Sequence, residues 1–551
     1  MPGSRALVEL PDTKPEPLPG SSLRPEGPDL DAAITVTIVV RSQADDETTE
    51  KDFRELAQTL PHERPSRSYD DFVRRYGSAE ADLAAVQAFA AGQGLTVVEA
   101  SAARCAAEVS GSLAALSRAF GVRFVTLDSA VGSYRSHDGP IRIPHNLRGI
   151  IEDVIGFDDR PILRPSVASS VLGKLTHTDP RTIADFYQFP PDATGAGQCV
   201  GILEFGGGFY QSDLETYFHL RGLSVPKITL VELEGQSNRP ADRKTILDCA
   251  EYYGQLPAGS GGNPRACNPN SLAYPGTAEC SMDIQLLGTL VPDALLAVYM
   301  APSTTRGLYI AFSRAIADLR LAPSVISCSW GWYENKEISQ RSMLSIDRLL
   351  RRAALKGVTV CVSTGDFGNG ASLFGQPVAQ FPATSPYVLA CGGSSVPPDL
   401  SRETTWYEVE GTVILSGGGG FSQVFPLPEW QKTAGAGSGG QTGRGSPDVA
   451  ARADVQTGYD VVVGGLDLPS GGTSAAAPMW AALAARMNQI LGHPVGFFTS
   501  LLYTKPFSSA TRKITQSGGG PCVPLPSWDT CTGLGSPVGT SLLAALSRRQ
   551  T

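Results

Sequence analysis

The sequence predicts an α/β protein whose larger part is a doubly wound parallel sheet, preceded by a smaller α+β domain. From about residue 199 onwards, continuous apolar runs of strand length alternate with helical patterns, as buried parallel strands require. Before about residue 158, helices are interleaved with short strands. The chain has 551 residues and is 42% hydrophobic, so a large buried core is feasible.

The N-terminal part divides into a tail and a domain. Residues 1–33 are rich in proline and polar side chains, and we expect them to be disordered. The α+β domain is expected over residues 34–160, beginning with the β-branched strand Ile34–Val40. Its other elements are predicted as helices near 78–92, 112–120 and 146–155 and strands near 95–99, 106–109 and 122–127.

A linker is expected between this domain and the rest of the chain. Residues 158–182 turn to proline, serine and threonine without periodicity, and we place the linker at 161–177. An exposed linker of this kind is where peptidases cut. The larger domain is therefore expected to span residues 178–551.

The larger domain is predicted from its alternating elements. Apolar runs predict strands at Cys199–Phe205, Leu295–Pro302, Val325–Trp330, Val358–Thr364, Tyr387–Gly392 and Tyr459–Gly464. Helical patterns fall at about 212–220, 277–290, 306–319, 337–355 and 474–491. The polar interruption Gly235–Pro275 is expected to be a surface loop. In a doubly wound sheet, functional residues gather beyond the C-terminal ends of the strands.

Composition excludes several classes of protein. The formal net charge of −9 argues against nucleic acid or an anionic membrane surface as a partner. No run of about 20 apolar residues is present, and the N-terminus does not read as a signal peptide. The ten cysteines include no CxxC pair, so zinc is not expected. Cys522 could pair with Cys531, and Cys249 with Cys267 or Cys280.

Ser474 is the first candidate for a catalytic residue. The stretch Ser470-Gly-Gly-Thr-Ser474 leads into an alanine-rich helical run that continues to about Leu491. Ser474 therefore lies in the first helical turn, where free N–H groups and the helix dipole favour an anion. A nucleophilic serine needs such donors for the oxyanion. A serine-capped core helix gives the same pattern, so the pattern alone leaves both interpretations open.

No histidine is placed to activate Ser474. Three of the six lie in the N-terminal domain, His177 lies in the linker, His219 ends a helix and His493 precedes a proline. We interpret them as surface or cap residues, so the base of a Ser-His-Asp triad is missing. Carboxylates can replace it.

Glu279 and Asp283 are the candidates for that base. They stand four residues apart in a predicted helix and so share one face. Two carboxylates this close share one proton, and the upper pKa of the pair rises, so such a base works in acid. The alternative is a solvated acidic helix face, although the neighbours of this pair are apolar.

Three further residues follow predicted strands. Asp366 comes after the strand that ends at Thr364 and, if protonated, could donate a hydrogen bond to an oxyanion. An Asx turn between glycines is the alternative for Asp366. Glu204 and Trp330 could support the base or serve local structure alone.

Taken together, these stretches resemble the sedolisin family of serine-carboxyl peptidases, in particular its kumamolisin-like members. The resemblance covers about residues 34–545 and implies a subtilisin-like peptidase domain. It also implies a ferredoxin-like activation prodomain, which blocks the cleft until autolysis in acid cuts the linker near Gly173. The matching residues are Ser470-Gly-Gly-Thr-Ser474 with Pro478, Glu279-x-x-x-Asp283, Ser329-Trp-Gly331, Gly365-Asp366, Gly417-Gly-Gly-Gly-Phe-Ser422, Phe425-Pro-Leu-Pro-Glu-Trp430, Ser446-Pro-Asp-Val449 and Gly132-Ser-Tyr-Arg135.

The resemblance also implies a role for each site residue. Ser474 matches the nucleophile, Glu279 the general base and Asp283 the partner of that base. Asp366 matches the oxyanion donor. The supporting elements implied are Glu204 and Trp330 for a hydrogen-bonded network, and Ser329–Gly331 and Gly417–Gly420 for backbone contacts to the substrate.

The sequence departs from the family at its calcium site. The resemblance implies an Asp-Ile pair and a later Gly-x-Gly-x-Asp segment, which here read Lys513-Ile514 and Leu525-Pro-Ser-Trp-Asp529. Asp529 and the Ile514 carbonyl group remain, but an ammonium group replaces one of two anionic ligands and repels the ion. We hypothesise that Lys513 pairs with Asp529 in place of calcium.

The sequence thus predicts an acid-acting serine-carboxyl endopeptidase, made as a secreted and monomeric proenzyme without an organic cofactor. Proteins or peptides would be its substrates, and its own prodomain would be its inhibitor. One rival is a neutral Ser-His-Asp hydrolase. A second rival is a peptide-binding relative that has kept the fold and lost turnover.

Overall fold

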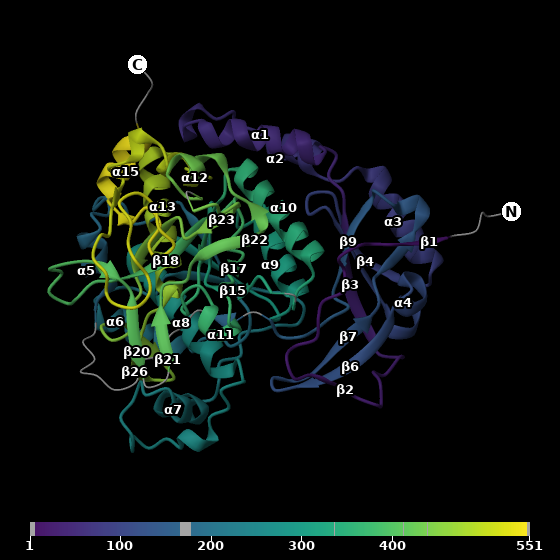
Figure 1. The fold of residues 1–551 in the computed structure, drawn as a ribbon, viewed down its shortest axis with the longest axis horizontal. Coiled ribbons are helices and arrows are strands. Elements are labelled where there is room, and N and C mark those ends of the chain that lie inside the picture. The colour runs from purple at the N-terminus through teal and green to yellow at the C-terminus, as the bar shows by residue number, and fades with distance from the viewer. Residues whose placement is uncertain are drawn as a thin grey trace.

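Two sheets of different kinds organise the protein (Figure 1). The computed structural model describes residues 6–162, 164–165, 178–335, 337–410, 413–437 and 439–547. The larger sheet has the strand order β12-β13-β11-β14-β16-β18-β19, with β24 paired to β18, and its strands are parallel except for β19. The bounds are β11 Cys199–Glu204, β12 Lys227–Glu232, β13 Leu295–Met300, β14 Val325–Cys328, β16 Thr359–Ser363, β18 Leu389–Ser395, β19 Thr404–Thr405 and β24 Val449–Arg452.

Helices cover both faces of this sheet, which confirms the predicted doubly wound class. Side chains alternate along each strand, so Ile202 joins one core and Leu203 the other. The first core is completed by α5 (Pro180–Phe186), α6 (Gln211–Leu220), α8 (Ala273–Leu290) and α13 (Thr473–Leu491). The second core is completed by α9 (Thr305–Ala317) and α10 (Gln340–Lys356).

The N-terminal domain contains an antiparallel sheet in the order β4-β5-β3-β9. In chain order its strands are β3 (Ala33–Val40), β4 (Thr96–Ser101), β5 (Ala106–Ser112) and β9 (Ile151–Ile155). The first and last strands therefore lie side by side, as in a ferredoxin-like fold. Helices α3 (Glu80–Gly92) and α4 (Leu113–Phe120) pack on this sheet, and β6 (Arg123–Ser129) and β7 (Gly132–Asp138) form a hairpin beside it.

Two predicted elements differ in the structure. The helix expected near residues 146–155 is wrong: β9 pairs with β3 there, because Ile151 and Val154 fill the core of the N-terminal domain and Ile155 packs into the second core of the larger domain. The predicted strand at 459–464 exists as β25 (Tyr459–Val463) but lies outside the main sheet. It pairs with β26 (Leu466–Ser470) in a hairpin that leads directly to Ser474.

The N-terminal tail also differs from the expectation of disorder. Within residues 6–33, β1 (Leu7–Glu9) pairs with β8 (Arg142–Pro144), and β2 (Ser22–Leu23) pairs with β6. Leu10 and Thr13 are buried and hydrogen-bond the backbone of Ile141, which anchors this proline-rich segment. A few apolar side chains and backbone pairing are sufficient to order a chain whose composition is typical of disorder.

The interruption at 235–275 contains the short helix α7 (Arg243–Tyr252) and a disulfide from Cys249 to Cys267. Cys280 is a buried free thiol in α8, so the alternative pairing is not used. A second disulfide joins Cys522 to Cys531, as expected. Among the residues that the structure describes, none of the helices has the length and apolarity needed to span a membrane.

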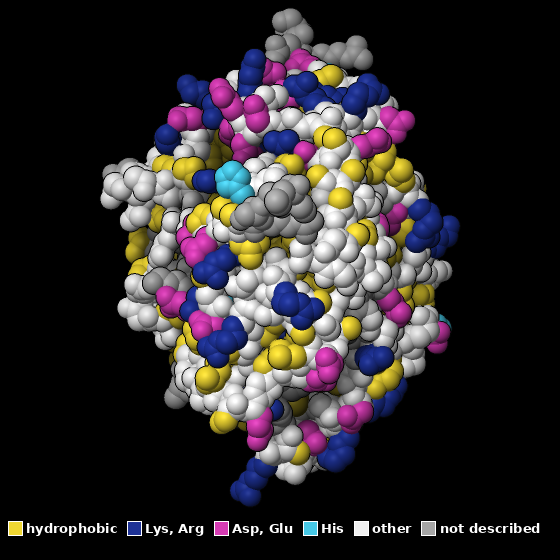
Figure 2. All heavy atoms as spheres, turned by 90° about the vertical axis from the view of Figure 1, so that its right-hand side faces the viewer, with side chains coloured by type: hydrophobic (Ala, Val, Ile, Leu, Met, Phe, Trp, Pro, Cys, Tyr) yellow, Lys and Arg dark blue, Asp and Glu magenta, His cyan; other side chains and the backbone are white. Residues whose placement is uncertain are grey.

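The two domains are in extensive contact. Helices α1 (Asp46–Gln58) and α2 (Tyr69–Tyr76), purple in Figure 1, extend from the N-terminal domain over the larger one. The ring of Phe53 lies 4.6 Å from that of Tyr387 and 5.0 Å from that of Phe497, measured between centroids. On the outer face of the N-terminal domain, basic and acidic side chains are interspersed (Figure 2). Most of the linker, including Gly173 and His177, lies outside the described residues.

Candidate active site

Ser474 is buried in the first turn of α13, directly after the β25–β26 hairpin. The turn into the helix is made at Gly472, whose φ of 85° is in the left-handed region that favours glycine. In this first turn the Thr473 N–H donates to the Asp366 carboxyl group at 2.8 Å and the Ala475 N–H to the Gly472 carbonyl at 3.0 Å, so the helix N-terminus already faces an acid beside Ser474. The structure therefore confirms the predicted position of this serine.

Ser329 lies in the turn between β14 and β15 (Trp330–Tyr333) and contacts Ser474 twice, through its carbonyl oxygen and through its hydroxyl group. The Ser474 hydroxyl donates to the Ser329 carbonyl oxygen at 3.3 Å. The Ser329 hydroxyl lies 3.3 Å from the Ser474 carbonyl oxygen. That carbonyl is open to such a donor because Pro478, four residues later in the helix, has no N–H group.

Three carboxyl groups are buried close to Ser474. Glu279 and Asp283 lie on α8, and Glu204 ends β11; all three are fully buried. The Trp330 indole donates to Glu204 at 3.0 Å. The Ser329 hydroxyl lies 2.8 and 3.0 Å from the two oxygens of Asp283. This burial excludes the alternative of a solvated acidic helix face.

The environment raises the pKa of each of these acids. Burial raises the pKa of Glu279 well above its ordinary value, and the charges of Asp283 and Glu204 raise it further. The Ser474 hydroxyl is close enough to Glu279 to act in the opposite direction. Burial and the charge of Asp283 raise the pKa of Glu204, against the Trp330 hydrogen bond. Burial also raises the pKa of Asp283, against the hydrogen bond from Ser329.

These shifts predict that the folded protein loses stability as the pH rises from acid to neutral. A carboxyl whose folded-state pKa is raised gives its full stabilisation below its unfolded pKa, and this is lost as the pH rises through the folded pKa. For each such group, every pH unit between its unfolded-state pKa and its folded-state pKa lowers the free energy of unfolding by about 1.4 kcal/mol. We expect Glu204→Gln, which no longer titrates, to show a smaller fall in thermal unfolding midpoint between about pH 5 and 8 than the native chain. An equal or larger fall in the midpoint of the variant would show that the titration of Glu204 does not cause the loss of stability.

Asp366 follows β16 and is fixed by the residue before the serine. Its Oδ1 accepts from the Thr473 backbone N–H at 2.8 Å and from the Thr473 hydroxyl at 3.0 Å. The Thr473 Oγ1 in turn accepts from the Gly365 N–H at 2.9 Å. The charge of Asp366 contributes to the raised pKa of Glu279. The structure thus brings Asp366 to the same site as Ser474.

A glycine-rich segment runs beside Asp366. The Gly418 N–H donates to the Gly365 carbonyl at 2.6 Å, and the Ser416 N–H donates to the Asp366 carbonyl at 2.9 Å. A β-carbon at Gly418 would lie 2.0 Å from the Thr364 carbonyl oxygen, so only glycine permits this approach. The segment 417–420 thereby forms one wall next to the site.

Sequence reasoning missed the side-chain roles of Ser329 and Thr473. Both residues were included in predicted motifs, but their hydroxyl groups received no role. The only sequence signal is that each lies next to a residue already singled out, Trp330 or Ser474. No histidine among the residues that the structure describes makes a hydrogen bond to Ser474.

Two more predicted residues lie elsewhere. Ile514 is buried, and Lys513 Nζ lies 2.8 Å from Asp529 Oδ2. The residues present there do not fit a calcium ion, because an ammonium group occupies the position facing the carboxylate. The described residues contain no group of three or more acidic, histidine or cysteine side chains that could hold a metal.

A subtilisin-like sheet, a buried serine at a helix N-terminus and adjacent buried carboxyl groups define a serine peptidase. Residues 23–160 match the family model "Pro-kumamolisin, activation domain", and residues 261–496 match the subtilase family. The chain is 38% identical over 547 residues to kumamolisin of Bacillus sp. (strain MN-32), which covers 94% of this chain and 92% of that protein. It therefore belongs to the sedolisin family of serine-carboxyl peptidases, as a kumamolisin-like member made with a prodomain.

Other similarities agree with this assignment. Sedolisin of Pseudomonas sp. (strain 101) is 26% identical over 514 residues, covering 87% of this chain and 81% of that protein. A solved structure of Pseudomonas sedolisin, a serine-carboxyl proteinase complexed with pseudo-iodotyrostatin, matches with a TM-score of 0.53 and 25% identity. It covers 68% of this chain and 98% of the other. The fold and the class of enzyme thus follow from structure and similarity together.

Proposed function

We propose that this proenzyme is an acid-acting endopeptidase that removes its own prodomain and cleaves proteins through an acyl-enzyme on Ser474. The observation that carries the proposal is the set of buried carboxyl groups beside Ser474. Among the described residues, no histidine hydrogen-bonds this serine. Adjacent carboxyl groups that share protons keep one member ionised in the acid range, so that a base is available where imidazole would already be protonated. We further propose that the enzyme acts outside the cell.

In this mechanism Glu279 takes the proton of Ser474 as its Oγ attacks the peptide carbonyl carbon. Glu279 returns that proton to the leaving amine, and a water molecule then hydrolyses the ester by the same route. Asp283, held by the Ser329 hydroxyl, lies on the same helix and raises the pKa of Glu279, which makes Glu279 a stronger base for the serine proton. Asp366 in its protonated form donates a hydrogen bond to the oxyanion. Glu204 and Trp330 form the hydrogen-bonded network that supports Glu279.

The substrate would bind as an added strand along β15. In the proenzyme, β10 (Arg164–Pro165) pairs antiparallel with β15, with Arg164 opposite Gly331 and Pro165 opposite Trp330. This backbone pairing is the usual way in which an extended peptide is recognised at a sheet edge. It supports a prodomain whose C-terminal end covers the position of a substrate.

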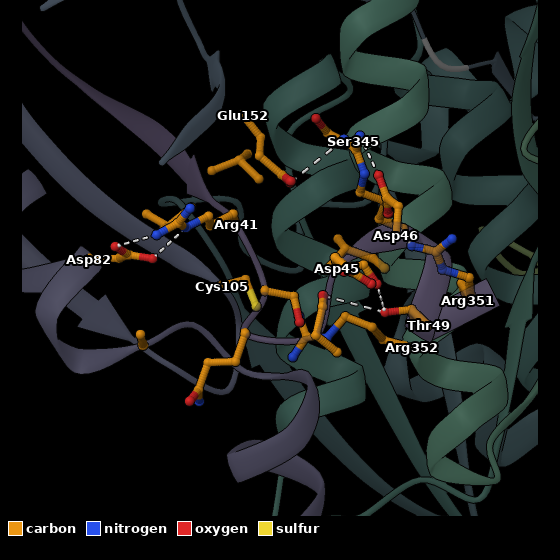
Figure 3. Close-up of a pocket in the computed structure, with 18 of the residues that line it drawn as sticks. Arg41, Asp45, Asp46, Thr49, Asp82, Cys105, Glu152, Ser345, Arg351 and Arg352 are labelled. Carbon is orange, nitrogen blue, oxygen red and sulfur yellow. Dashed lines mark hydrogen bonds and ion pairs between the residues drawn. The ribbon is translucent and has the colours of Figure 1, made fainter. Parts of the chain in front are cut away.

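The contact between the domains supports activation in acid. Arginines of α9 and α10 face carboxylates of the prodomain: Arg348 Nη2 lies 3.2 Å from Asp46 Oδ2, and Arg314 Nη1 lies 3.2 Å from Glu99 Oε1. A cavity of about 540 Å³ lies at this interface, lined by Asp46 and Glu152 of the prodomain and by Arg351 of α10 (Figure 3). It lies between the domains and not at Ser474.

The charges in this interface set the direction of its pH dependence. Burial would raise the pKa of Asp46, but Arg348 and Arg351 outweigh it and lower that pKa. Arg104 and Arg314 likewise outweigh burial and lower the pKa of Glu99. Groups with lowered pKa values stabilise docking above their ordinary pKa, and this is lost as the pH falls through the lowered value.

Two other prodomain acids in this interface act in the opposite sense. Burial raises the pKa of Asp153 to about 6, against a hydrogen bond from Ser342, and burial raises the pKa of Glu152. These two acids are neutralised first as the pH falls, which favours docking. Release of the prodomain is therefore expected to begin at about pH 4, in the ordinary carboxylate range, and to become complete only in stronger acid, where Asp46 and Glu99 protonate.

The proposal is tested on the native chain at about pH 7 and about pH 4, either side of the carboxylate range. We expect the mass to stay constant at pH 7 and to fall at pH 4 as the prodomain and linker are removed, with cleavage of an added unfolded protein at internal bonds. Mass spectrometry identifies both sets of products. Activity that is highest near pH 8 would favour a histidine base, and release of short N-terminal fragments alone would contradict an endopeptidase.

A further inference from the structure

We infer that Lys513 replaces a structural calcium ion: its ammonium group holds the loop at residues 525–535, so that the peptidase domain is stable without a divalent cation. The family resemblance implies calcium at this place. The side chains of this protein instead form a closed, internally paired site. The inference concerns stability and is independent of the proposed catalytic mechanism.

The ammonium group lies inside the loop. Lys513 Nζ donates to Asp529 Oδ2 at 2.8 Å and to the Gly533 carbonyl oxygen at 2.7 Å. The Asp529 side chain is 2% exposed and that of Lys513 is 20% exposed. An acid buried to this degree needs a compensating positive charge, and the lysine supplies one.

The remaining acceptor positions of Asp529 are also used. Its Oδ1 accepts from the Cys531 N–H at 3.0 Å, from the Thr532 N–H at 2.7 Å and from the Thr532 hydroxyl at 3.1 Å. Its Oδ2 accepts from the Leu525 N–H at 3.1 Å in addition to the lysine. A carboxylate offers about four lone-pair sites, so this one has none left for a metal. Calcium requires 6–8 oxygen ligands and cannot share the site with an ammonium group.

The loop held by this ion pair supports the wall of the active site. The Thr530 carbonyl packs so closely on Gly419 that a β-carbon there would lie 1.8 Å from its oxygen. The Trp528 indole donates to the Pro447 carbonyl at 2.8 Å. Gly418, the neighbour of Gly419, is bonded to the backbone next to Asp366. The position of Lys513 therefore bears on both the fold and the geometry of the site.

The first test uses a protein that keeps Lys513 and Asp529 and carries only the substitution Ser474→Ala, so that autolysis does not interfere. We expect no calcium in an elemental analysis of the purified protein. We also expect the same thermal unfolding midpoint in EDTA as in calcium chloride. One bound calcium per chain, or a midpoint that falls in EDTA, would overturn the inference.

The second test replaces the lysine in the same background. Lys513→Met leaves a buried carboxylate unpaired, and we expect the midpoint to fall by roughly 5 °C, with no response to calcium. Lys513→Asp is expected to lower the midpoint in EDTA and to recover it with calcium. The control is Lys432→Met, because Lys432 forms an exposed pair with Glu429 and should change the midpoint little. An unchanged midpoint in Lys513→Met, or a folded Lys513→Asp protein that ignores calcium, would contradict the inference.

Discussion

Replacing Ser474 with alanine is expected to leave the chain at full length at about pH 4, where the native chain loses its prodomain. The alanine has no oxygen to form the acyl-enzyme, so peptide hydrolysis should fall by about 10⁴-fold or more. Gel electrophoresis follows the processing, and the initial rate on a peptide substrate gives the loss of activity. The fold should persist, because α13 is anchored by the buried apolar side chains that follow Ser474.

A matched control is available four residues earlier. Ser470 ends β26, is also buried, and pairs with Tyr459 in the β25–β26 hairpin. We expect Ser470→Ala to be processed in acid and to hydrolyse peptide as the native chain does. If Ser474→Ala loses its prodomain at the native rate in a highly purified preparation, Ser474 is not the nucleophile. If Ser470→Ala is inactive as well, the loss reflects damage to the helix start.

Replacing Glu279 with glutamine is expected to lower kcat by about 10²–10⁴-fold, because the amide cannot take the serine proton. The two side chains have nearly the same size, so the buried volume is preserved and KM should change little. Removing one of three adjacent buried acids should also make the protein more stable at neutral pH, because the pKa of Glu279 is raised. Steady-state kinetics near pH 4 and thermal unfolding near pH 7 measure the two effects.

Glu204→Gln provides the comparison for Glu279→Gln. Glu204 is equally buried but accepts a hydrogen bond from the Trp330 indole, whereas the Ser474 hydroxyl is close enough to Glu279 to lower the pKa of that acid. We expect a smaller loss of kcat and a similar gain in stability at neutral pH. Equal losses of kcat in the two variants would mean that the buried charge as a whole matters, and not the position of one base. Full activity in Glu279→Gln would exclude it as the base.

Much of the peptidase domain could be predicted from the sequence, because its signals are local. Runs such as 199–205, apolar except for Glu204, and 295–302 are typical of strands buried on both faces. The spacing of Glu279 and Asp283 places them on one helical face wherever that helix lies. The glycines before Ser474 place it at a helix N-terminus. None of these inferences depends on a partner distant in the chain.

Other features were decided by contacts between distant residues. The segment expected as a helix at 146–155 is a strand because it pairs with an edge of β3. Residues 6–33 are ordered because Leu10 is buried in a core. Cys249 had two possible partners by sequence, and only the fold placed Cys267 beside it. A window of sequence contains no information about such neighbours.

The sequence by itself singled out Ser474, Glu279, Asp283 and Asp366 as candidates for the chemistry, from local patterns and motif order. The tertiary structure decided the environment of these residues. It buried the carboxyl groups, placed the Ser329 hydroxyl against Asp283 and fixed Asp366 through Thr473. The physical reason is that burial and pKa depend on every group packed around a site, and those groups come from strands and helices far apart in the chain.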